Sequence, residues 1–204
     1  MRIVVFGASG GTGRAFIAQA VEAGYDVTAV VRRAAAFAEG ERLRVVQADV
    51  GVASQMDDVL RGQDVVVSAQ GANGKGPLTV CTDVTRSILE AMGRSGTRRL
   101  VVVSAYGAAD THDRSPYSLL LWASVGDKMR DKESMEALVM ASDVDWTIIR
   151  PPRLTDGPLR SHYRTGTTLK IGLTSKVSRA DLADFMLTEA VSSAYSHQLP
   201  RIAA

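Results

Sequence analysis

The sequence predicts an α/β fold built on a doubly wound parallel sheet, folded as a single domain over residues 1–204. The first observation is a short apolar run at 3–6 that leads into the glycine motif Gly7-x-x-Gly10-x-x-Gly13 and then into an alanine-rich helix pattern at 14–22. The second is that strand and helix patterns alternate along almost the whole chain, as a parallel sheet covered on both faces requires. The third is size, since 204 residues with 46% hydrophobic content can bury one substantial core. Together these features indicate a Rossmann-type NAD(P)-binding domain.

Each further element follows from apolar periodicity and from turn residues. Strands are expected at 27–31, 43–47, 64–68, 100–103 and 146–150, and helices at 54–60, 78–94, 117–141 and 178–191. One face of the helix at 78–94 is expected to carry Val80, Val84, Ile88 and Met92.

The chain after the sixth strand is less regular. Pro151 and Pro152 end that strand, because proline has no N–H to donate and restricts the residue before it. The segment 153–177 is expected to be irregular, with one short strand near 169–171, and to cover the bound acceptor. The sequence Ser178-Arg-Ala-Asp181 is similar to a capping box and is expected to begin the last helix.

The glycine motif is expected to bind a pyrophosphate, because bare backbone can turn sharply and the following helix N-terminus attracts an anion. The residues assigned to this cradle are Gly7, Ser9, Gly10, Gly11, Thr12 and Gly13. The same letters also fit the Gly-x-Ser-x-Gly nucleophile elbow of α/β-hydrolases. That elbow follows several strands, whereas Ser9 follows the first, so we interpret Ser9 as shaping the phosphate turn.

Other candidate cofactor contacts follow from the rule that ligands bind at the carboxyl ends of parallel strands. Arg32 and Arg33 follow the second strand, where a carboxylate would select NAD, and two guanidinium groups instead favour the 2′-phosphate of NADP(H). The alternative is that one or both arginines are simply solvated. Asp49 can accept a hydrogen bond from adenine or can cap a turn, and Val50 can cover a ring face. The fourth strand contributes Ala69, Gln70 and Gly71.

The ends of the fifth and sixth strands are expected to flank the nicotinamide. The fifth contributes Ser104, Ala105 and Tyr106, and the sixth contributes Pro151, Pro152 and Arg153. None of the five tyrosines has a lysine four residues later, so the dyad that protonates a carbonyl in many short-chain dehydrogenases is absent from the sequence. Flavins and linear tetrapyrroles accept hydride into a conjugated system and can take their proton from solvent, so the absence favours such acceptors.

Composition excludes several other classes of protein. The formal net charge is +2 and no long basic block occurs, so nucleic-acid binding is not indicated. Cys81 is the only cysteine, and no apolar run is long enough to span a bilayer or to form a signal peptide, so a cytoplasmic protein with no membrane association is expected. The three histidines have no metal-ligand spacing, so no metal site is expected. A monomer or weak homo-oligomer is the expected state.

Several motifs together resemble a known family. They are Gly7-Ala-Ser-Gly-Gly-Thr-Gly13, Val30-Val-Arg-Arg33, Gln47-Ala-Asp49-Val50, Val102-Val-Ser104-Ala105, Trp146-Thr-Ile-Ile-Arg-Pro-Pro152 and Val177-Ser-Arg-Ala-Asp-Leu-Ala183. The chain resembles the atypical short-chain dehydrogenases with an NmrA-like domain, and among them the NADPH-dependent flavin reductases, also called biliverdin-IX-beta reductases, to about residue 200. The resemblance implies that Ser104 lies near the nicotinamide and acceptor and that Arg32 and Arg33 hold the 2′-phosphate.

The chain departs from that family at Arg153, where its flavin and biliverdin reductases typically have a histidine. An arginine can stabilise an anionic acceptor but cannot donate a proton near neutral pH. Lys132 matches a lysine common in the broader family, although we interpret it and Glu136 as a solvated pair one helical turn apart.

The sequence therefore predicts an NADPH-dependent reductase of a flavin or another flat conjugated acceptor, with Ser104 and Arg153 as catalytic residues. A sugar or isoprenoid reductase or epimerase of the same superfamily is a second interpretation, which the missing tyrosine–lysine pair disfavours. A third is an NmrA-like redox sensor that binds NADP(H) without turnover.

Overall fold

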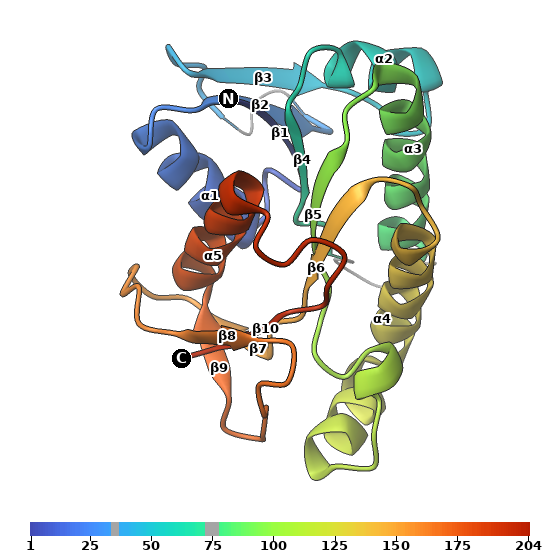
Figure 1. The fold of residues 1–204 in the computed structure, drawn as a ribbon, viewed down its shortest axis with the longest axis vertical. Helices are drawn as coiled ribbons and strands as arrows, with labels where there is room; N and C mark the ends of the chain where they lie inside the picture. The colour runs from blue at the N-terminus through green and yellow to red at the C-terminus, as the bar shows by residue number, and fades with distance from the viewer. Residues whose placement is uncertain (34–36, 72–77) are drawn as a thin grey trace.

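A computed structural model, which describes residues 1–33, 37–71 and 78–204, has one six-stranded parallel sheet at its centre (Figure 1). The strand order is β3-β2-β1-β4-β5-β6, so the chain crosses from one half of the sheet to the other after β3, as a doubly wound sheet does. The six strands are β1 (Arg2–Phe6), β2 (Asp26–Val31), β3 (Leu43–Gln47), β4 (Val65–Ser68), β5 (Arg99–Val103) and β6 (Asp145–Ile149). The predicted Rossmann-type fold is confirmed.

Helices cover both faces of the sheet. They are α1 (Gly11–Glu22), α2 (Ala53–Leu60), α3 (Val80–Ser95), α4 (Pro116–Met140) and α5 (Arg179–Ser192), with a short 3-10 turn, η2 (Ala109–Thr111), between β5 and α4. In Figure 1, α1 and α5 lie together on one side of the sheet, and α2, α3 and α4 lie on the other.

Alternation along the strands divides the apolar side chains between two cores. Ile3 and Val5 of β1 pack in the core beneath α1 and α5, whereas Val4 and Phe6 pack in the core beneath α2, α3 and α4. All four of these side chains are fully buried. Because both faces are covered, the strands are apolar throughout, which explains why the apolar runs identified them in the sequence.

The C-terminal part of the chain differs from the prediction. No strand forms at 169–171. Instead β7 (Arg153–Thr155) pairs in parallel with β9 (Lys176–Ser178), and β8 (Arg164–Gly166) pairs antiparallel with β10 (Arg201–Ala203). The partners of these three-residue strands lie more than twenty residues away along the chain, so local sequence patterns could not reveal them.

Helix α3 also begins later than expected, at Val80. Val84, Ile88 and Met92 are buried as predicted, but Val80, the first residue of the helix, is 41% exposed. Within the described parts of the chain, no helix is both long enough and apolar enough to cross a membrane.

Candidate functional site

The glycine motif forms a tight turn between β1 and α1. Gly7 adopts φ +76°, and its carbonyl accepts a hydrogen bond from the Gly10 N–H at 3.0 Å. A Cβ at Gly7 would lie 2.6 Å from the carbonyl oxygen of Ala69, and a Cβ at Gly13 would lie 2.3 Å from the carbonyl oxygen of Gly7. The turn can therefore form only with bare backbone, and it leaves the first N–H groups of α1 available to an anion.

A cavity of about 950 Å³ opens beside this turn, along the carboxyl ends of β1 to β4. It is lined by nine of the residues that the sequence assigned to the cofactor: Gly7, Ser9, Gly10, Arg32, Asp49, Val50, Ala69, Gln70 and Gly71. Further lining residues, which the sequence analysis did not assign to the cofactor, include Gln55, Val80, Asp83 and Val84 from α2 and α3. The helices α2 and α3 reach this edge only in the folded sheet, so no local signal marked them.

Arg32 and Arg33 lie directly beyond β2, and both side chains are exposed. Arg32 lines the cavity, whereas Arg33 does not. Neither guanidinium forms an ion pair within the described residues, so Arg32 can offer its full set of donors to a ligand in the cavity.

Asp49 has a local structural role besides its place in the cavity wall. Its Oδ1 accepts from the Gly51 N–H at 2.9 Å, and its own N–H donates to Gln55 Oε1 at 2.7 Å. The first contact is a short Asx turn, one of the two roles left open by the sequence. An adenine contact through the other carboxylate oxygen stays a prediction.

The residues expected around the nicotinamide lie outside this cavity, at the ends of β5 and β6. The Ser104 N–H donates to the Ile149 carbonyl at 2.8 Å, and the Tyr106 N–H donates to the Pro151 carbonyl at 2.9 Å. The two strand ends are thereby joined. The Ser104 side chain is 4% exposed, and its Oγ has no hydrogen-bond partner among the described residues.

Arg153 does not join this group. It is the first residue of β7, its side chain is exposed, and it neither lines the cavity nor forms an ion pair within the described residues. Among the remaining predicted residues, Gly11 is exposed, Ala105 is partly buried, and Thr12 and Pro152 are buried. The catalytic role of Arg153 stays a prediction without a supporting contact.

Lys132 corrects the interpretation made from the sequence. Its Nζ donates to the carbonyl of Gln70 at 2.8 Å and to that of Val103 at 2.7 Å. It therefore joins the ends of β4 and β5 at the carboxyl edge of the sheet. The expected solvated pair with Glu136 was wrong because the two side chains turn inward to different partners.

Glu136 binds Arg150 at the end of β6. The Arg150 Nε donates to Oε1 at 3.0 Å and Nη2 donates to Oε2 at 2.7 Å, a two-point contact between side chains that are no more than 2% exposed. Nη1 of Arg150 also donates to Asp110 at 2.6 Å. Burial lowers the pKa of Arg150, but the two carboxylates outweigh that effect and raise it, so the guanidinium stays charged.

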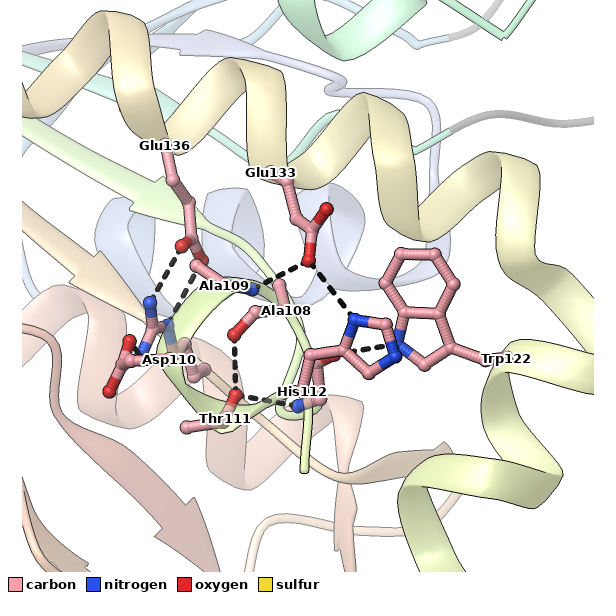
Figure 2. A network of polar contacts seen from close by, with 10 residues as sticks. Ala108, Ala109, Asp110, Thr111, His112, Trp122, Glu133 and Glu136 are labelled. Carbon is pink, nitrogen blue, oxygen red and sulfur yellow. Dashed lines mark hydrogen bonds and ion pairs between the residues drawn. The ribbon is translucent and has the colours of Figure 1, made fainter. Parts of the chain in front are cut away.

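Figure 2 shows how α4 also holds the turn after β5. The Ala109 N–H donates to Glu133 at 2.9 Å, and His112 stacks on Trp122 with the ring centroids 3.8 Å apart. The Trp122 indole N–H in turn donates to the Gly107 carbonyl at 2.9 Å. The turn that continues Ser104, Ala105 and Tyr106 is thus fixed by several independent contacts.

Asp131, next to Lys132, caps α3 from the neighbouring helix. Its carboxylate accepts from the N–H groups of Cys81 and Thr82, each at 2.9 Å. A carboxylate supplied by another helix satisfies the free donors and the dipole of α3 in place of a local capping side chain. The spacing of residues within α3 contained no signal for this contact.

The fold and this edge of the sheet are those of a dinucleotide-binding protein, and comparison with known families agrees. Residues 7–192 match the model of the NAD(P)H-binding family. The chain belongs to that family.

A curated relative supports the assignment, and solved structures share the fold. The UPF0659 protein C216.03 of Schizosaccharomyces pombe is 30% identical over 218 residues, which cover 95% of this chain and 86% of the relative. The solved structure of ChuY from Escherichia coli O157:H7, described as an anaerobillin reductase, has a TM-score of 0.86 at 23% identity, covering 99% of this chain and 96% of ChuY. The oxidoreductase ylbE of Lactococcus lactis has a TM-score of 0.85 at 17% identity, covering 99% of this chain and 90% of ylbE.

Proposed function

We propose that this protein is an NADPH-dependent reductase whose acceptor is a flat conjugated ring system such as a flavin. The observation that carries the proposal is the buried Ser104 Oγ without a partner at the end of β5. Leaving a buried hydroxyl unpaired costs about 1–3 kcal/mol, so such a group calls for a partner that a ligand can supply. We place the nicotinamide and its acceptor beside the β5–β6 junction, because ligands in this fold class bind at the carboxyl ends of the strands.

The residues present fit a dinucleotide. The turn at Gly7 and Gly13 has no room for a Cβ, and the exposed first residue of α1, Gly11, lets a diphosphate approach the helix N-terminus. The bound nicotinamide supplies the hydride. The chain's own part is to fix the two carbonyls held by Lys132 and to orient the Ser104 hydroxyl toward the acceptor.

The arrangement at α4 supports a conjugated acceptor over an isolated ketone. The Lys132 ammonium donates hydrogen bonds to the Gln70 and Val103 carbonyls. The residue four positions before it is Lys128. The position from which a tyrosine of the usual dyad would donate a proton is therefore a lysine here. A conjugated ring spreads the charge of the incoming hydride over several atoms and can accept its proton from solvent, so it does not need a proton donor positioned by the protein.

Arg32 supports NADPH as the preferred cofactor. It lines the cavity with an exposed guanidinium, and Arg33 stands next to it. A fork of N–H donors fits a phosphate, whereas no carboxylate follows β2 directly to accept hydrogen bonds from an unphosphorylated ribose. The name of ChuY as an anaerobillin reductase makes a linear tetrapyrrole a second acceptor to test.

The test is NADPH oxidation, followed optically, with FMN, riboflavin and biliverdin supplied in turn and NADH as the comparison. We expect turnover with at least one flavin, and we expect Ser104→Ala to lower that turnover by about tenfold or more without weakening NADPH binding. Tight NADPH binding with no turnover on any acceptor would contradict the proposal and indicate a redox sensor.

Cofactor preference is measured separately by equilibrium binding. Arg32→Gln should weaken NADPH by about tenfold and leave NADH unchanged, because one charge-assisted contact is lost. Arg44→Gln is the matched control, since Arg44 is an exposed arginine on β3 that does not line the cavity. A twofold or smaller difference between NADPH and NADH in the unmodified protein would refute the preference.

A further inference from the structure

The side chain of Arg179 lies across the N-terminus of α1. A Cβ built at Gly11, the first residue of α1, would lie 2.6 Å from Arg179 Cδ and 3.0 Å from its Nε. Arg179 is the first residue of α5 and is about 170 positions away along the sequence. A cation that the motif itself does not contain is therefore held against the glycine turn.

The backbone of Arg179 is fixed relative to α1. Ser178 caps α5 by accepting from the Asp181 N–H at 2.9 Å, and α5 packs along α1. The Gln19 side chain on α1 donates to the Ala180 carbonyl at 2.9 Å, one residue beyond Arg179. These contacts hold the Arg179 backbone close to the start of α1, where its side chain lies.

The guanidinium also has a partner on the segment that follows β7. Nη1 of Arg179 donates to Asp156 Oδ1 at 2.6 Å. The Asp156 side chain is 93% exposed, so the pair stabilises the fold very little. A guanidinium has five N–H donors, and this contact uses one, so Nε and Nη2 are left to serve an anion at Gly11.

We propose that Arg179 is a ligand of the cofactor diphosphate and that, through Asp156, it links cofactor binding to the segment 157–175 between β7 and β9. The inference rests on the proposed function, because it takes the dinucleotide to lie at the glycine turn. The N–H groups of α1 and the guanidinium of Arg179 both lie there, and both favour a phosphate. The role differs from the one proposed for Arg32, which lines the cavity and would contact the 2′-phosphate.

Three probes separate the two arginines. ADP-ribose contains the diphosphate without a 2′-phosphate, 2′-AMP contains the 2′-phosphate without a diphosphate, and NADPH contains both. We expect Arg179→Gln to weaken ADP-ribose and NADPH by about tenfold and to leave 2′-AMP unchanged, whereas Arg32→Gln should weaken 2′-AMP and NADPH only. Arg160→Gln is the matched control, because Arg160 is an exposed arginine on the same segment without an ion pair among the described residues.

The outcomes are distinct. If the unmodified protein binds ADP-ribose and Arg179→Gln binds it equally well, this inference is wrong and the proposed function is untouched. If the unmodified protein binds none of the three probes, the proposed function and this inference fall together. Equal weakening of 2′-AMP by Arg179→Gln would also contradict the inference, because it would show a general loss of charge or structure.

The link to the segment is tested by hydrogen exchange. NADPH should slow exchange in peptides from 157–175 of the unmodified protein, and this protection should be lost at saturating NADPH in Arg179→Gln and in Asp156→Asn. Asp156→Asn should keep its ADP-ribose affinity within about threefold, since Asp156 does not touch the phosphate. Undiminished protection in Asp156→Asn would overturn the link.

Discussion

Replacing Glu136 by Gln should lower the unfolding temperature by about 7 °C. The variant removes one carboxylate from the pair with Arg150, whose side chains are 0% and 2% exposed. Breaking a buried ion pair by removing one partner costs about 3–5 kcal/mol, and Gln can keep one hydrogen bond, so we expect about 3 kcal/mol. A chain of 204 residues has an unfolding entropy of about 0.4 kcal/mol per kelvin, which converts that loss into the stated shift.

The assay is thermal unfolding followed by circular dichroism at fixed protein concentration. Asp58→Asn is the matched control, because its pair with Arg61 has a similar distance of 3.1 Å but side chains that are 71% and 77% exposed. That variant should lose less than about 1 kcal/mol, or about 2 °C. The double variant Glu136→Leu/Arg150→Met should recover most of the lost stability, because it leaves no buried unpaired charge. Asp110 also loses its contact with Arg150 in that variant, but its side chain is 70% exposed and stays solvated. A shift for Glu136→Gln no larger than that of the control would refute the reasoning.

Three further predictions follow from contacts at the same edge of the sheet. Gly13→Ala should abolish detectable NADPH binding in a titration, because its Cβ would lie 2.3 Å from the Gly7 carbonyl oxygen. The control Gly93→Ala, whose Cβ would have nothing within 4 Å, should unfold at the same temperature as the unmodified protein or at a higher one. Lys132→Met should weaken NADPH binding by about tenfold and leave the circular dichroism spectrum unchanged, because the ends of β4 and β5 lose their common donor. An unchanged affinity for NADPH would show that this donor does not position the site. Burial raises the pKa of the Cys81 thiol, so little of it is thiolate at pH 8. A disulfide reagent should therefore react at least about tenfold more slowly with the native protein than with the protein unfolded in urea. Equal rates would contradict this prediction.

The sequence was sufficient for the sheet and for one half of the site. Gly7, Arg32 and Asp49 could be placed at the cavity because each lies just beyond an apolar strand, and parallel strands bring their carboxyl ends to one edge. The prediction depended only on local patterns and on a rule about topology, both of which the structure satisfies.

Lys132, Glu136 and Arg179 could not be placed from the sequence, because they act through tertiary contacts. The spacing of Lys132 and Glu136 is equally compatible with a solvated pair and with two side chains that turn inward. Arg179 reaches Gly11 only because β9 pairs with β7 and α5 packs on α1. Side chains that act across tertiary contacts leave no periodic signal, so the sequence contained the residues but not their partners.

The charged face of α4 bears on the chemistry of the proposed reaction. Asp131 caps α3, Lys132 holds the ends of β4 and β5, Glu133 fixes the turn after β5, and Glu136 binds the arginine at the end of β6. Three of these side chains therefore position the strand ends around Ser104, and the fourth, Asp131, fixes the start of α3. A helix whose charges are used in this way supplies rigidity to the site and keeps none of these groups free to move protons. An acceptor that needs orientation more than acid catalysis, as a flat conjugated ring does, is the kind of substrate that such a site suits.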